Sequence, residues 1–511
     1  MSNNRMKAVL WSSLTLLSAA LLTAGCSLAP EYKVPASAAS AAFKETPVTT
    51  ATAATQGQAG AWKIAQPSDQ IPRGKWWVIF DDPALDDLEE QALAANQNLA
   101  AAAARLQEAR ALQQATRAGL FPTIDAGFGP TREKVSPASQ LQPDGGNIPA
   151  QTLWRAQATA SYEVDLFGRV SDAVRASRAE SEQSAALLRS VQLSLQADVA
   201  ANYFKVRELD AELQVYAQNV SLREQALKLV QSKFGAGDIA ELDVARAKAE
   251  LATARSDAMT AERQRATAEH SLAVLLGKAP SEFSMASNPL RPVQIRIPPG
   301  LPSALLERRP DIAAAERTMA AANARVGVAK AAYFPALSIT GAAGFESATL
   351  ADLFKWSSRA FILGPLAGTA LTVPIFDGGR RAGNLANARA VFDEDVAKYR
   401  QQVLQAFQEV EDNLSDLRIL EQQVQTQDEA VQASSRAATI SRTQYREGAV
   451  NYLDVIDAER TVLQSQTTAV QLTGLQAAAT VNLVRALGGG WGDDVTVGSI
   501  DTTRAESTGR Q

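Results

Sequence analysis

The chain has 511 residues, with 50 Lys and Arg against 55 Asp and Glu, and a formal net charge of −5. This acidic balance argues against nucleic acid as a partner. A single His and a single Cys leave no clustered ligands of the kind that a zinc site needs.

The first residues predict an export signal. Arg5 and Lys7 supply a positive region, and residues 9–22 form an apolar stretch of the length typical of a signal peptide. Residues 22–26, LTAGC, then resemble a bacterial lipobox, in which the Cys sulfur is acylated before cleavage. The alternative is an ordinary signal peptide that happens to contain a Cys near its end.

We predict lipidation at Cys26, because a lone Cys in an exported protein cannot form an internal disulfide. Ser27 follows it, so nothing resembles an inner-membrane retention signal. Cleavage of residues 1–25 removes Arg5 and Lys7 and lowers the side-chain charge from −5 to −7. Residues 26–60 are rich in Ala, Ser, Thr and Pro, which predicts a flexible tether behind the lipid.

The most informative feature is an internal repeat with an offset of roughly 210 residues. The first repeat spans residues 61–279, a linker follows at 280–310, and the second repeat spans 311–488 before a tail at 489–511. Three landmarks recur: Phe121-Pro122 as Phe334-Pro335, residues 164–169 (VDLFGR) as 373–380 (VPIFDGGR), and residues 234–244 (FGAGDIAELDV) as 445–455 (YREGAVNYLDV).

Between these landmarks the pattern is helical. No Pro interrupts residues 170–279 or 375–511, so long helices are possible, and we expect helical hairpins over 169–276 and 380–487. Sustained heptads predict coiled-coil packing. One apolar row is Val199, Val206, Leu213, Val220, Leu227 and Phe234, and after the turn a second row is Ala245, Ala252, Met259, Ala266 and Ala273.

Four other segments are rich in Gly, Thr, aromatic and β-branched residues and predict strands: 122–132, 151–167, 335–347 and 359–376. After the signal, no run approaches the 18 or more apolar residues of a membrane helix, so any membrane crossing requires strands. Four strands cannot close a barrel, and open edges cannot lie in lipid. The barrel would be shared between chains, with eight strands from two copies or twelve from three.

The order of these features resembles a known family. The motif WWVIFDDPAL at residues 76–85, continued by Leu88, Leu93, Asn96 and Leu99, precedes an Ala-rich helix, a Phe-Pro strand and the second copy. This order, behind a lipobox and a low-complexity tether, is similar to the TolC-like outer membrane factors. It most resembles their lipidated branch, the NodT-type outer-membrane lipoproteins of RND efflux systems.

The resemblance implies an α+β membrane protein that forms a homotrimer. Its twelve-stranded β-barrel, four strands per chain, would lie in the outer membrane and continue into a long α-helical coiled-coil barrel in the periplasm. Residues 62–84, 280–310 and the C-terminal region would form a mixed α/β equatorial belt. The implied partners are a periplasmic adaptor and an inner-membrane pump of RND type.

The implied function is passive conduction of small molecules, such as drugs and toxic compounds, out of a tripartite efflux pump. A channel for type I polypeptide secretion is the alternative within this class. A coiled-coil lipoprotein without a barrel would explain the lipobox and the heptads, but not four strand-like segments placed alike in two copies. No catalytic motif occurs, so we expect no enzymatic activity and no cofactor beyond the lipid on Cys26.

The helix turns near 234–244 and 445–455 are the predicted functional tip. Asp454 and Asp457 resemble the paired aspartates that line the family's constriction, and their spacing of three points both the same way on a helix. Alternatively, Asp454 is a helix-start acid and Asp457 pairs with Arg460. In the first copy Arg246 replaces the second acid, so Asp243 is expected to pair locally with Arg246.

By the same resemblance, Tyr445 and Asp243 are expected to bridge neighbouring helix pairs and hold the tip shut. Gly235, Gly237 and Gly448 are interpreted as turn residues with positive φ. The same glycines are candidates for contact with the tip of an adaptor.

Overall fold

The computed structural model describes residues 27–35, 43–45, 74–134, 136, 149–292, 305–306, 308–363 and 371–489. The expected signal peptide, Cys26, most of the tether and the expected tail beyond Gly489 lie outside the described residues. The chain forms two compact units, the first from residues 1–36, 105–184 and 315–399, the second from 37–104, 185–314 and 400–511. Each unit therefore combines parts of both sequence repeats.

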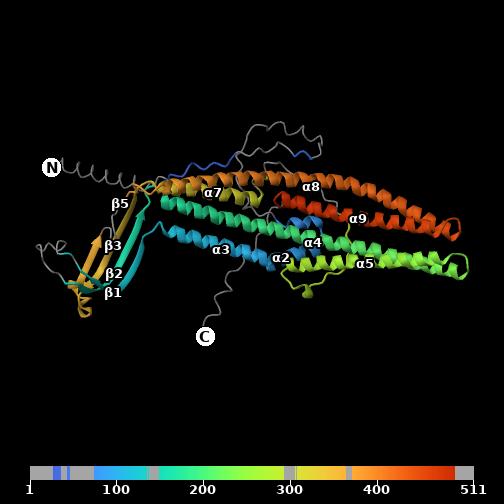
Figure 1. The fold of residues 1–511 in the computed structure, drawn as a ribbon, viewed down its shortest axis with the longest axis horizontal. Helices are drawn as coiled ribbons and strands as arrows, with labels where there is room; N and C mark the ends of the chain where they lie inside the picture. Colours follow the sequence, from blue (N-terminus) through green and yellow to red (C-terminus); the bar gives the residue numbers. More distant parts are fainter. Residues whose placement is uncertain are drawn as a thin grey trace. The chain divides into compact units, whose positions relative to one another are not determined.

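The first unit contains one antiparallel sheet, in the order β1-β2-β3-β4, with a short β5 also paired to β3 (Figure 1). The strands are β1 (Thr123–Glu133), β2 (Gln151–Val164), β3 (Ala336–Ser347), β4 (Arg359–Leu363) and β5 (Leu371–Thr372).

The first three strands lie where the sequence predicts them. The fourth expected segment, 359–376, contains β4 and β5, which both pair with β3, and its residues 364–370 lie outside the described chain. The register brings Arg155 of β2 to Glu133 of β1 at 2.9 Å and to Glu346 of β3 at 2.6 Å. One guanidinium therefore joins three strands.

Both outer strands of this sheet have an open edge. Among the described residues, β1 pairs only with β2, and β4 pairs only with β3. Large apolar side chains also lie exposed on these strands, with Ile124 at 74% and Phe361 at 84%. Unpaired backbone groups and exposed apolar surface at a sheet edge are a ready template for another chain.

Helices make up most of the rest. The α-helices are α2 (Pro83–Ala95), α3 (Gln97–Ala118), α4 (Arg169–Gly235), α5 (Glu241–Leu275), α7 (Pro310–Ala331), α8 (Arg380–Arg446) and α9 (Tyr452–Ala486). Short 3-10 helices are η2 (Trp76–Phe80), η4 (Pro280–Glu282), η5 (Leu350–Asp352) and η6 (Trp356–Ser358). No helix in the described ranges is long and apolar enough to span a bilayer.

The two long hairpins repeat at a fixed offset. Every bound of α4 and α5 recurs 211 residues later in α8 and α9, as the starts at Arg169 and Arg380 illustrate. In the second unit, α5 lies beside the C-terminal part of α4, and α9 lies beside α8 (Figure 1). The two Pro-free stretches thus form two hairpins of equal length.

The packing seam of α5 differs from the predicted one. Met259 is 66% exposed, and Ala245 and Ala252 are also exposed. The buried row begins one residue earlier, at Val244, and continues with Ala247, Leu251, Ala254, Ala261 and Leu272, although Ala273 of the predicted row is also buried. The prediction was wrong because α5 is so rich in Ala that apolar residues occur on several faces, and an Ala row does not specify the buried face.

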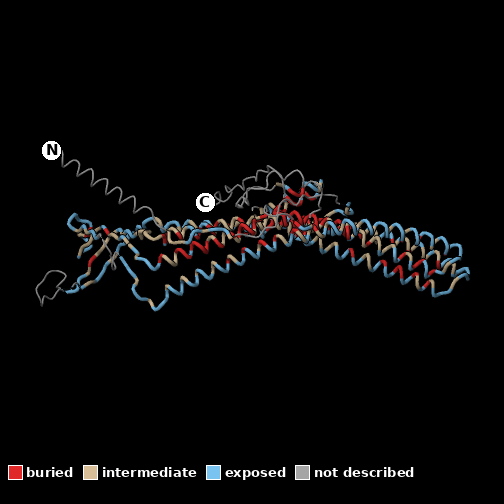
Figure 2. The backbone as a smooth tube through the Cα atoms, turned by 90° about the horizontal axis from the view of Figure 1, so that it is seen from above, coloured by how far each residue is buried: buried red, intermediate tan, exposed pale blue. Residues whose placement is uncertain are grey.

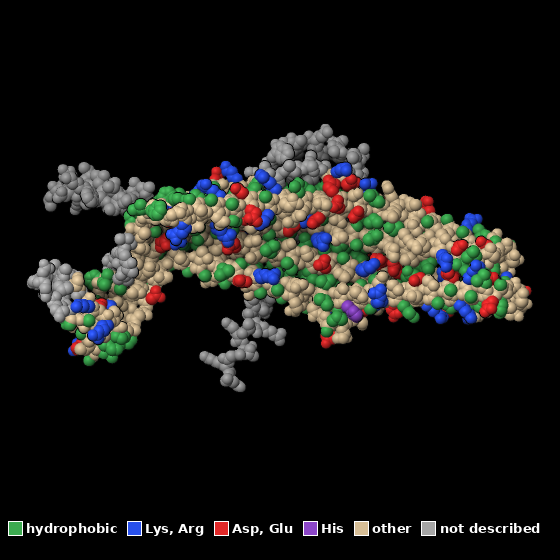
Figure 3. Space-filling view, in the orientation of Figure 1, with side chains coloured by type: hydrophobic (Ala, Val, Ile, Leu, Met, Phe, Trp, Pro, Cys, Tyr) green, Lys and Arg blue, Asp and Glu red, His purple; other side chains and the backbone are tan. Residues whose placement is uncertain are grey.

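The core of the second unit contains η2 and α2. Trp76 and Trp77 are 4% and 2% exposed, as expected for residues packed in a belt, and they share an apolar cluster with Leu85, Leu88, Val199, Tyr203, Leu272 and Val484. Figure 2 shows such buried positions alternating with exposed ones along the helices, and Figure 3 shows acidic and basic side chains spread over their outer surface. The cluster therefore joins the WWVIFDDPAL segment to both hairpins.

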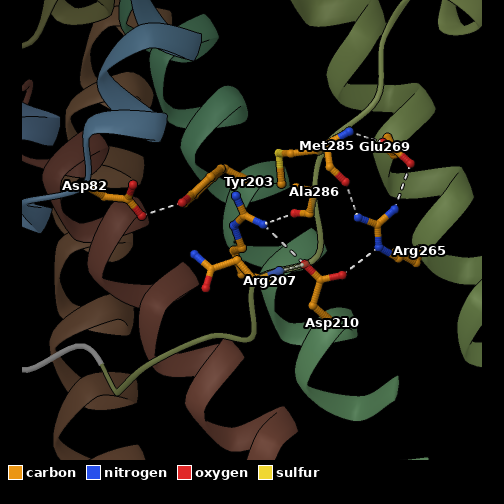
Figure 4. A network of polar contacts seen from close by, with 9 residues as sticks. Asp82, Tyr203, Arg207, Asp210, Arg265, Glu269, Met285 and Ala286 are labelled. Atoms are coloured by element: carbon orange, nitrogen blue, oxygen red, sulfur yellow. Dashed lines mark hydrogen bonds and ion pairs between the residues drawn. The ribbon is translucent and has the colours of Figure 1, made fainter. Parts of the chain in front are cut away.

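A polar network fixes part of the linker after α5 (Figure 4). Asp210 of α4 is fully buried and accepts hydrogen bonds from Arg207, Arg265 and the backbone N–H of Asn288, at 3.3, 2.6 and 2.9 Å. The same arginines donate to the carbonyl oxygens of Ala286 and Met285, both at 2.7 Å. Residues 285–288 are therefore held against α4 and α5.

The tether is not flexible throughout, contrary to the prediction. Residues 27–35 belong to the first unit, where the Ser27 hydroxyl donates to Asp172 at 2.7 Å. Residues 43–45 belong to the second unit, where Phe43 is only 5% exposed. The composition of the tether predicts that it is flexible on average. Tyr32 and Phe43 nevertheless contact the body of the chain, and two aromatic residues among many small ones have little effect on that average.

Candidate functional site

The candidate site is the pair of turns at the ends of the hairpins, α4 to α5 and α8 to α9. In each turn a Gly has positive φ, Gly237 at +84° and Gly448 at +78°. Asp238 N–H donates to Lys233 O at 3.0 Å, and Ala449 N–H donates to Gln444 O at 2.8 Å. Both turns thus have the Schellman pattern of helix termination, in which Gly avoids the Cβ penalty.

Gly235 does not share this role. It is the last residue of α4 and does not have positive φ, so its interpretation as a turn residue was wrong. A Cβ added at Gly235, Gly237 or Gly448 would meet no atom within 4 Å. These three positions are therefore open surface on the described chain.

An apolar cluster lies directly behind the turns. It contains Val230 of α4, Val244 and Ala247 of α5, Tyr445 of α8, and Tyr452, Val455 and Ile456 of α9. The Tyr445 and Tyr452 rings pack 5.4 Å apart, and burial raises the pKa of Tyr452 to about 12. All four helices therefore meet in one small core, which we call the tip cluster.

Asp454 has a structural role within the chain. It is the third residue of α9 and forms a capping box with Asn451: the Asn451 side chain accepts from Asp454 N–H, and the Asp454 carboxylate accepts from Asn451 N–H, both at 3.2 Å. This arrangement satisfies two backbone donors at the helix start. In the first copy Ala240 is at the equivalent position and makes no such bond.

Asp457 is exposed and loosely held. Its carboxylate is 3.9 Å from the Arg460 guanidinium, and its side chain is 65% exposed. The expected Asp243–Arg246 pair is present at 3.6 Å. Asp454 and Asp457 are both exposed, so their carboxylates are available to a neighbouring molecule.

Within the described part of the chain, Tyr445 and Asp243 do not form the expected bridge. The Tyr445 hydroxyl is buried and has no hydrogen-bond partner in the described part of the chain. Burial and the nearby Asp243 charge both raise the pKa of Tyr445. Lys233 makes the connection between α4 and α8 instead: its ammonium donates to Tyr445 O at 3.1 Å and lies 4.5 Å from the centre of the Tyr445 ring. Asp243 instead pairs with Arg246 on its own helix, because side chains three residues apart on a helix lie next to each other.

A charged network next to the tip cluster was missed by the sequence reasoning. Glu250 of α5 accepts hydrogen bonds from Arg223 of α4 and from Arg460 of α9. Burial opposes ionisation of Glu250, but the bonds from Arg460 and Arg223 outweigh it and lower its pKa. Asn219 supports the network by accepting from Arg223 at 2.7 Å. We call Arg223, Glu250 and Arg460 the tip latch.

A second pair lies beside the tip latch. The Glu459 carboxylate of α9 is 3.3 Å from the Arg442 guanidinium of α8, and Glu459 is 6% exposed. Burial raises the pKa of Glu459, against the attraction of Arg442 and Arg223. The tip latch and the Glu459–Arg442 pair together join all four helices through charged side chains.

One signal in the sequence could have indicated the latch. At the 211-residue offset, Arg223 corresponds to Ser434 and Glu250 corresponds to Thr461. Charged residues in one copy thus replace small hydroxyls in the other. The second copy therefore cannot form the same ion pair between its own two helices. Within the described ranges, no group of three or more His, Cys, Asp or Glu could hold a metal ion.

Comparison with known proteins identifies the family. The profile of the family described as "Outer membrane efflux protein" matches residues 88–278 and 301–489. The chain belongs to the outer membrane efflux protein family. The two matched stretches contain the α4–α5 hairpin and the α8–α9 hairpin respectively.

Relatives in this family extend the similarity over nearly the whole chain. The toluene efflux pump outer membrane protein TtgF of Pseudomonas putida is 34% identical over 478 residues, which cover 93% of this chain and 96% of TtgF. The pyoverdine export outer membrane protein OpmQ of Pseudomonas aeruginosa is 33% identical, covering 84% of this chain and 90% of OpmQ.

Solved structures of the outer membrane efflux type have the same fold. The outer-membrane channel OprN superposes with a TM-score of 0.81 at 31% identity, covering 91% of this chain and 100% of OprN. The open-state MtrE outer membrane channel of Neisseria gonorrhoeae gives 0.76 at 28% identity, covering 91% of this chain and 98% of MtrE. As an outer membrane efflux protein, this chain acts in efflux and is located in the outer membrane.

Proposed function

We propose that the protein is the exit channel of a tripartite efflux pump. It conducts small molecules passively and without catalysis, and its helical tip is the closable end. The observation that carries this proposal is the tip latch, because Glu250 joins α5 to both α4 and α9 beside the turns. Membership of the outer membrane efflux protein family supports the transport role.

We infer that three copies assemble. Four strands with open edges at β1 and β4 need partners, and three copies would supply the twelve strands that the family resemblance implies. Three copies would also place three pairs of Asp454 and Asp457 around one axis. A ring of exposed carboxylates favours cations and repels anions. We therefore propose these aspartates as constriction residues in addition to the capping role of Asp454.

The proposed partners are a periplasmic adaptor and an inner-membrane pump of RND type. The open surface at Gly235, Gly237 and Gly448 would admit an adaptor segment close to the backbone. Relatives are named for toluene efflux and for pyoverdine export, two chemically different cargoes. This difference supports a conduit whose cargo is selected by the pump, with small toxic compounds as the class proposed here.

A lipid on Cys26 completes the proposal. The lipobox-like residues 22–26 and the absence of another Cys support a thioether-linked lipid as the anchor. Intact-mass measurement of the mature protein tests this directly. A chain beginning at residue 26 with added acyl mass supports it, and an unmodified thiol contradicts it.

Bilayer recordings test the channel and its gate. We would reconstitute the purified mature protein and compare wild type with Asp454→Ala, Asp457→Ala and the double variant. A small, cation-selective conductance that rises and loses selectivity in the double variant supports both proposals. Asn451→Ala is the matched control, because it breaks the capping box and leaves both carboxylates in place.

Each other outcome has a defined meaning. Equal currents in all variants retain the channel and reduce Asp454 and Asp457 to capping and local pairing. An increase in Asn451→Ala equal to that of the double variant assigns the effect to the helix start. No current from monomeric protein contradicts the channel.

A further inference from the structure

Two short segments before residue 46 make specific contacts with the helices of the chain. They are residues 27–35 and residues 43–45, and together we call them the N-terminal arm. The first site combines side chains of the arm with buried polar groups of the helices, and the second site buries an aromatic side chain of the arm among apolar residues. The first site belongs to the first unit and the second site to the second unit.

The first site is formed by α4 and α7 close to the strands. The Ser27 hydroxyl donates to Asp172, which lies in the first turn of α4 and is itself fully buried. The carbonyl oxygen of Pro30 accepts from the Asn323 side chain of α7 at 2.9 Å. The Tyr32 hydroxyl donates to the Glu316 carboxylate at 2.5 Å, and Glu316 is only 6% exposed.

Gly327 of α7 makes this first site possible. A Cβ at position 327 would meet the Asp172 carboxylate and would lie 2.8 Å from the Ala29 side chain. The backbone of α7 therefore approaches both the arm and α4 more closely than any other residue would allow. A helix-interior Gly lowers helix stability relative to Ala, so close approach is the physical reason for Gly here.

The second site is an apolar socket with polar rims. Phe43 packs with Leu305, Val410, Leu414, Leu483, Ala486 and Leu487. Glu411 of α8 accepts the backbone N–H groups of Lys44 and Glu45 at 2.7 and 3.1 Å, and Arg418 pairs with Glu45 at 2.8 Å. A buried aromatic anchor with bonded backbone amides is the pattern of a specific peptide site.

We propose that the N-terminal arm is a strap that holds the N-terminus in place on the body of the protein. The first site lies where helix meets strand, since Asp172 follows the end of β2 by eight residues and Gly327 lies four residues before the end of α7. Consecutive Cα atoms are about 3.8 Å apart, so a lipid on Cys26 would be attached beside this junction. This last clause rests on the lipidation proposed above.

The function of the strap is to set the depth of the anchor relative to the strands. A lipid on a free tether would fix only membrane attachment, because a chain of this composition is flexible. A docked arm instead ties the acylated residue to the ends of α4 and α7. The contacts in both sites come from the chain itself, so docking is independent of the lipid.

Limited proteolysis with trypsin tests the docking. Lys33 and Lys44 have exposed side chains, at 74% and 87%, so cleavage after them depends on release of the backbone. We expect the full-length mature protein to resist cleavage at both. Phe43→Ala should accelerate cleavage after Lys44 by at least tenfold, and Gly327→Ala should do the same after Lys33.

A matched control separates release of the arm from general damage. Gly383→Ala, on α8, adds a Cβ that meets nothing within 4 Å and should not affect cleavage. Wild-type protein that is cut at Lys33 and Lys44 as fast as Phe43→Ala would overturn the proposal.

A lipid-free form distinguishes docking of the arm by its own contacts from retention of the arm by the lipid. Cys26→Ser, exported by an ordinary signal peptide, removes the lipid and retains all arm contacts. Resistance equal to wild type supports docking by the chain alone, whereas cleavage as fast as in Phe43→Ala shows that the lipid holds the arm and overturns the proposal. Intact mass reports lipidation separately, so failure of that proposal is seen independently.

Discussion

Arg460 of α9 and Glu250 of α5, 210 residues apart in sequence, form an ion pair in the structure. Arg223 of α4 binds the other carboxylate oxygen of Glu250. The Arg223 side chain is 6% exposed and that of Glu250 is 11% exposed, so the pair is largely shielded from water. Removing one partner of a shielded pair strongly lowers the stability of the folded protein, because the other charge is left buried without a partner.

Glu250→Gln should therefore destabilise the tip. We expect a loss of about 2 kcal/mol in the free energy of unfolding, below the usual range for fully buried pairs because Arg460 is 59% exposed. If the latch restrains the channel, the bilayer conductance of this variant should also rise. Glu262→Gln, exposed on the same helix, is the control and should change neither quantity.

The effect of Glu250 should depend on pH in a defined direction. Its folded pKa lies below the ordinary value of 4.5, so its contribution is present above pH 4.5 and is lost as the pH falls through the lowered pKa. Melting curves of wild type and Glu250→Gln should approach each other as the pH falls below 4.5. Curves that stay parallel to pH 3 would contradict an ionic latch.

The effect of Glu89 of α2 on the stability of the fold should depend on pH in the opposite direction. It is fully buried, neither carboxylate oxygen has a partner in the described part of the chain, and burial together with Asp86 raises its pKa to about 9. The unfolded chain ionises near pH 4.5, so stability should fall as the pH rises from 4.5 to 9. Glu89→Gln removes this loss and should stabilise by about 2–4 kcal/mol at pH 7.5.

Melting temperature as a function of pH checks the Glu89 prediction. The difference between Glu89→Gln and wild type should be small at pH 5 and should grow up to pH 9. Glu108→Gln, exposed on α3, is the control for removal of a carboxylate. A constant difference across this range would show that Glu89 does not exchange its proton on unfolding.

Two glycines with similar backbone angles should respond differently to Ala. Gly277 and Gly237 have φ of +68° and +84°, so either substitution costs about 1 kcal/mol for the left-handed conformation. A Cβ at Gly277 would also meet the Ala95 carbonyl, whereas one at Gly237 would meet nothing within 4 Å. Gly277→Ala should therefore cost about 2 kcal/mol more than Gly237→Ala in thermal or denaturant unfolding. Equal losses would contradict the close approach of α5 to α2.

The missing cap of α5 can be supplied. Ala240 is at the position that Asn451 occupies before α9, and Asp243 is at the position of Asp454. Ala240→Asn should complete a capping box and stabilise the start of α5 by about 1 kcal/mol. Ala240→Val, which cannot accept a hydrogen bond, is the control. A gain in both variants would assign the effect to something other than capping.

Much of the fold could be predicted from the sequence for a simple physical reason. Long helices need only a sustained apolar period and freedom from Pro, and both are visible between residues 169 and 276. Schellman turns need Gly at one position, so Gly237 and Gly448 mark the ends of α4 and α8. These are local properties, which a single sequence contains in full.

The parts that could not be predicted depend on distant partners. The spacing of three made Asp457 the alternative partner for Arg460, but the Arg460 guanidinium binds Glu250 more closely than Asp457, which is 3.9 Å away. Phe43 is a single aromatic residue in a low-complexity stretch, and its socket comes from residues beyond 304. The choice between neighbouring partners depends on packing, which periodicity alone does not determine.

The common length of the two hairpins restricts how this protein can change size. Inserting one heptad into α4 and α5 alone would move their turn by about 10 Å. Val230 and Val244 would then lose contact with Tyr445 and Val455, and the tip cluster would separate into two exposed halves. Longer or shorter descendants of this chain should therefore carry insertions or deletions in matched sets, one in each copy, at positions 211 residues apart.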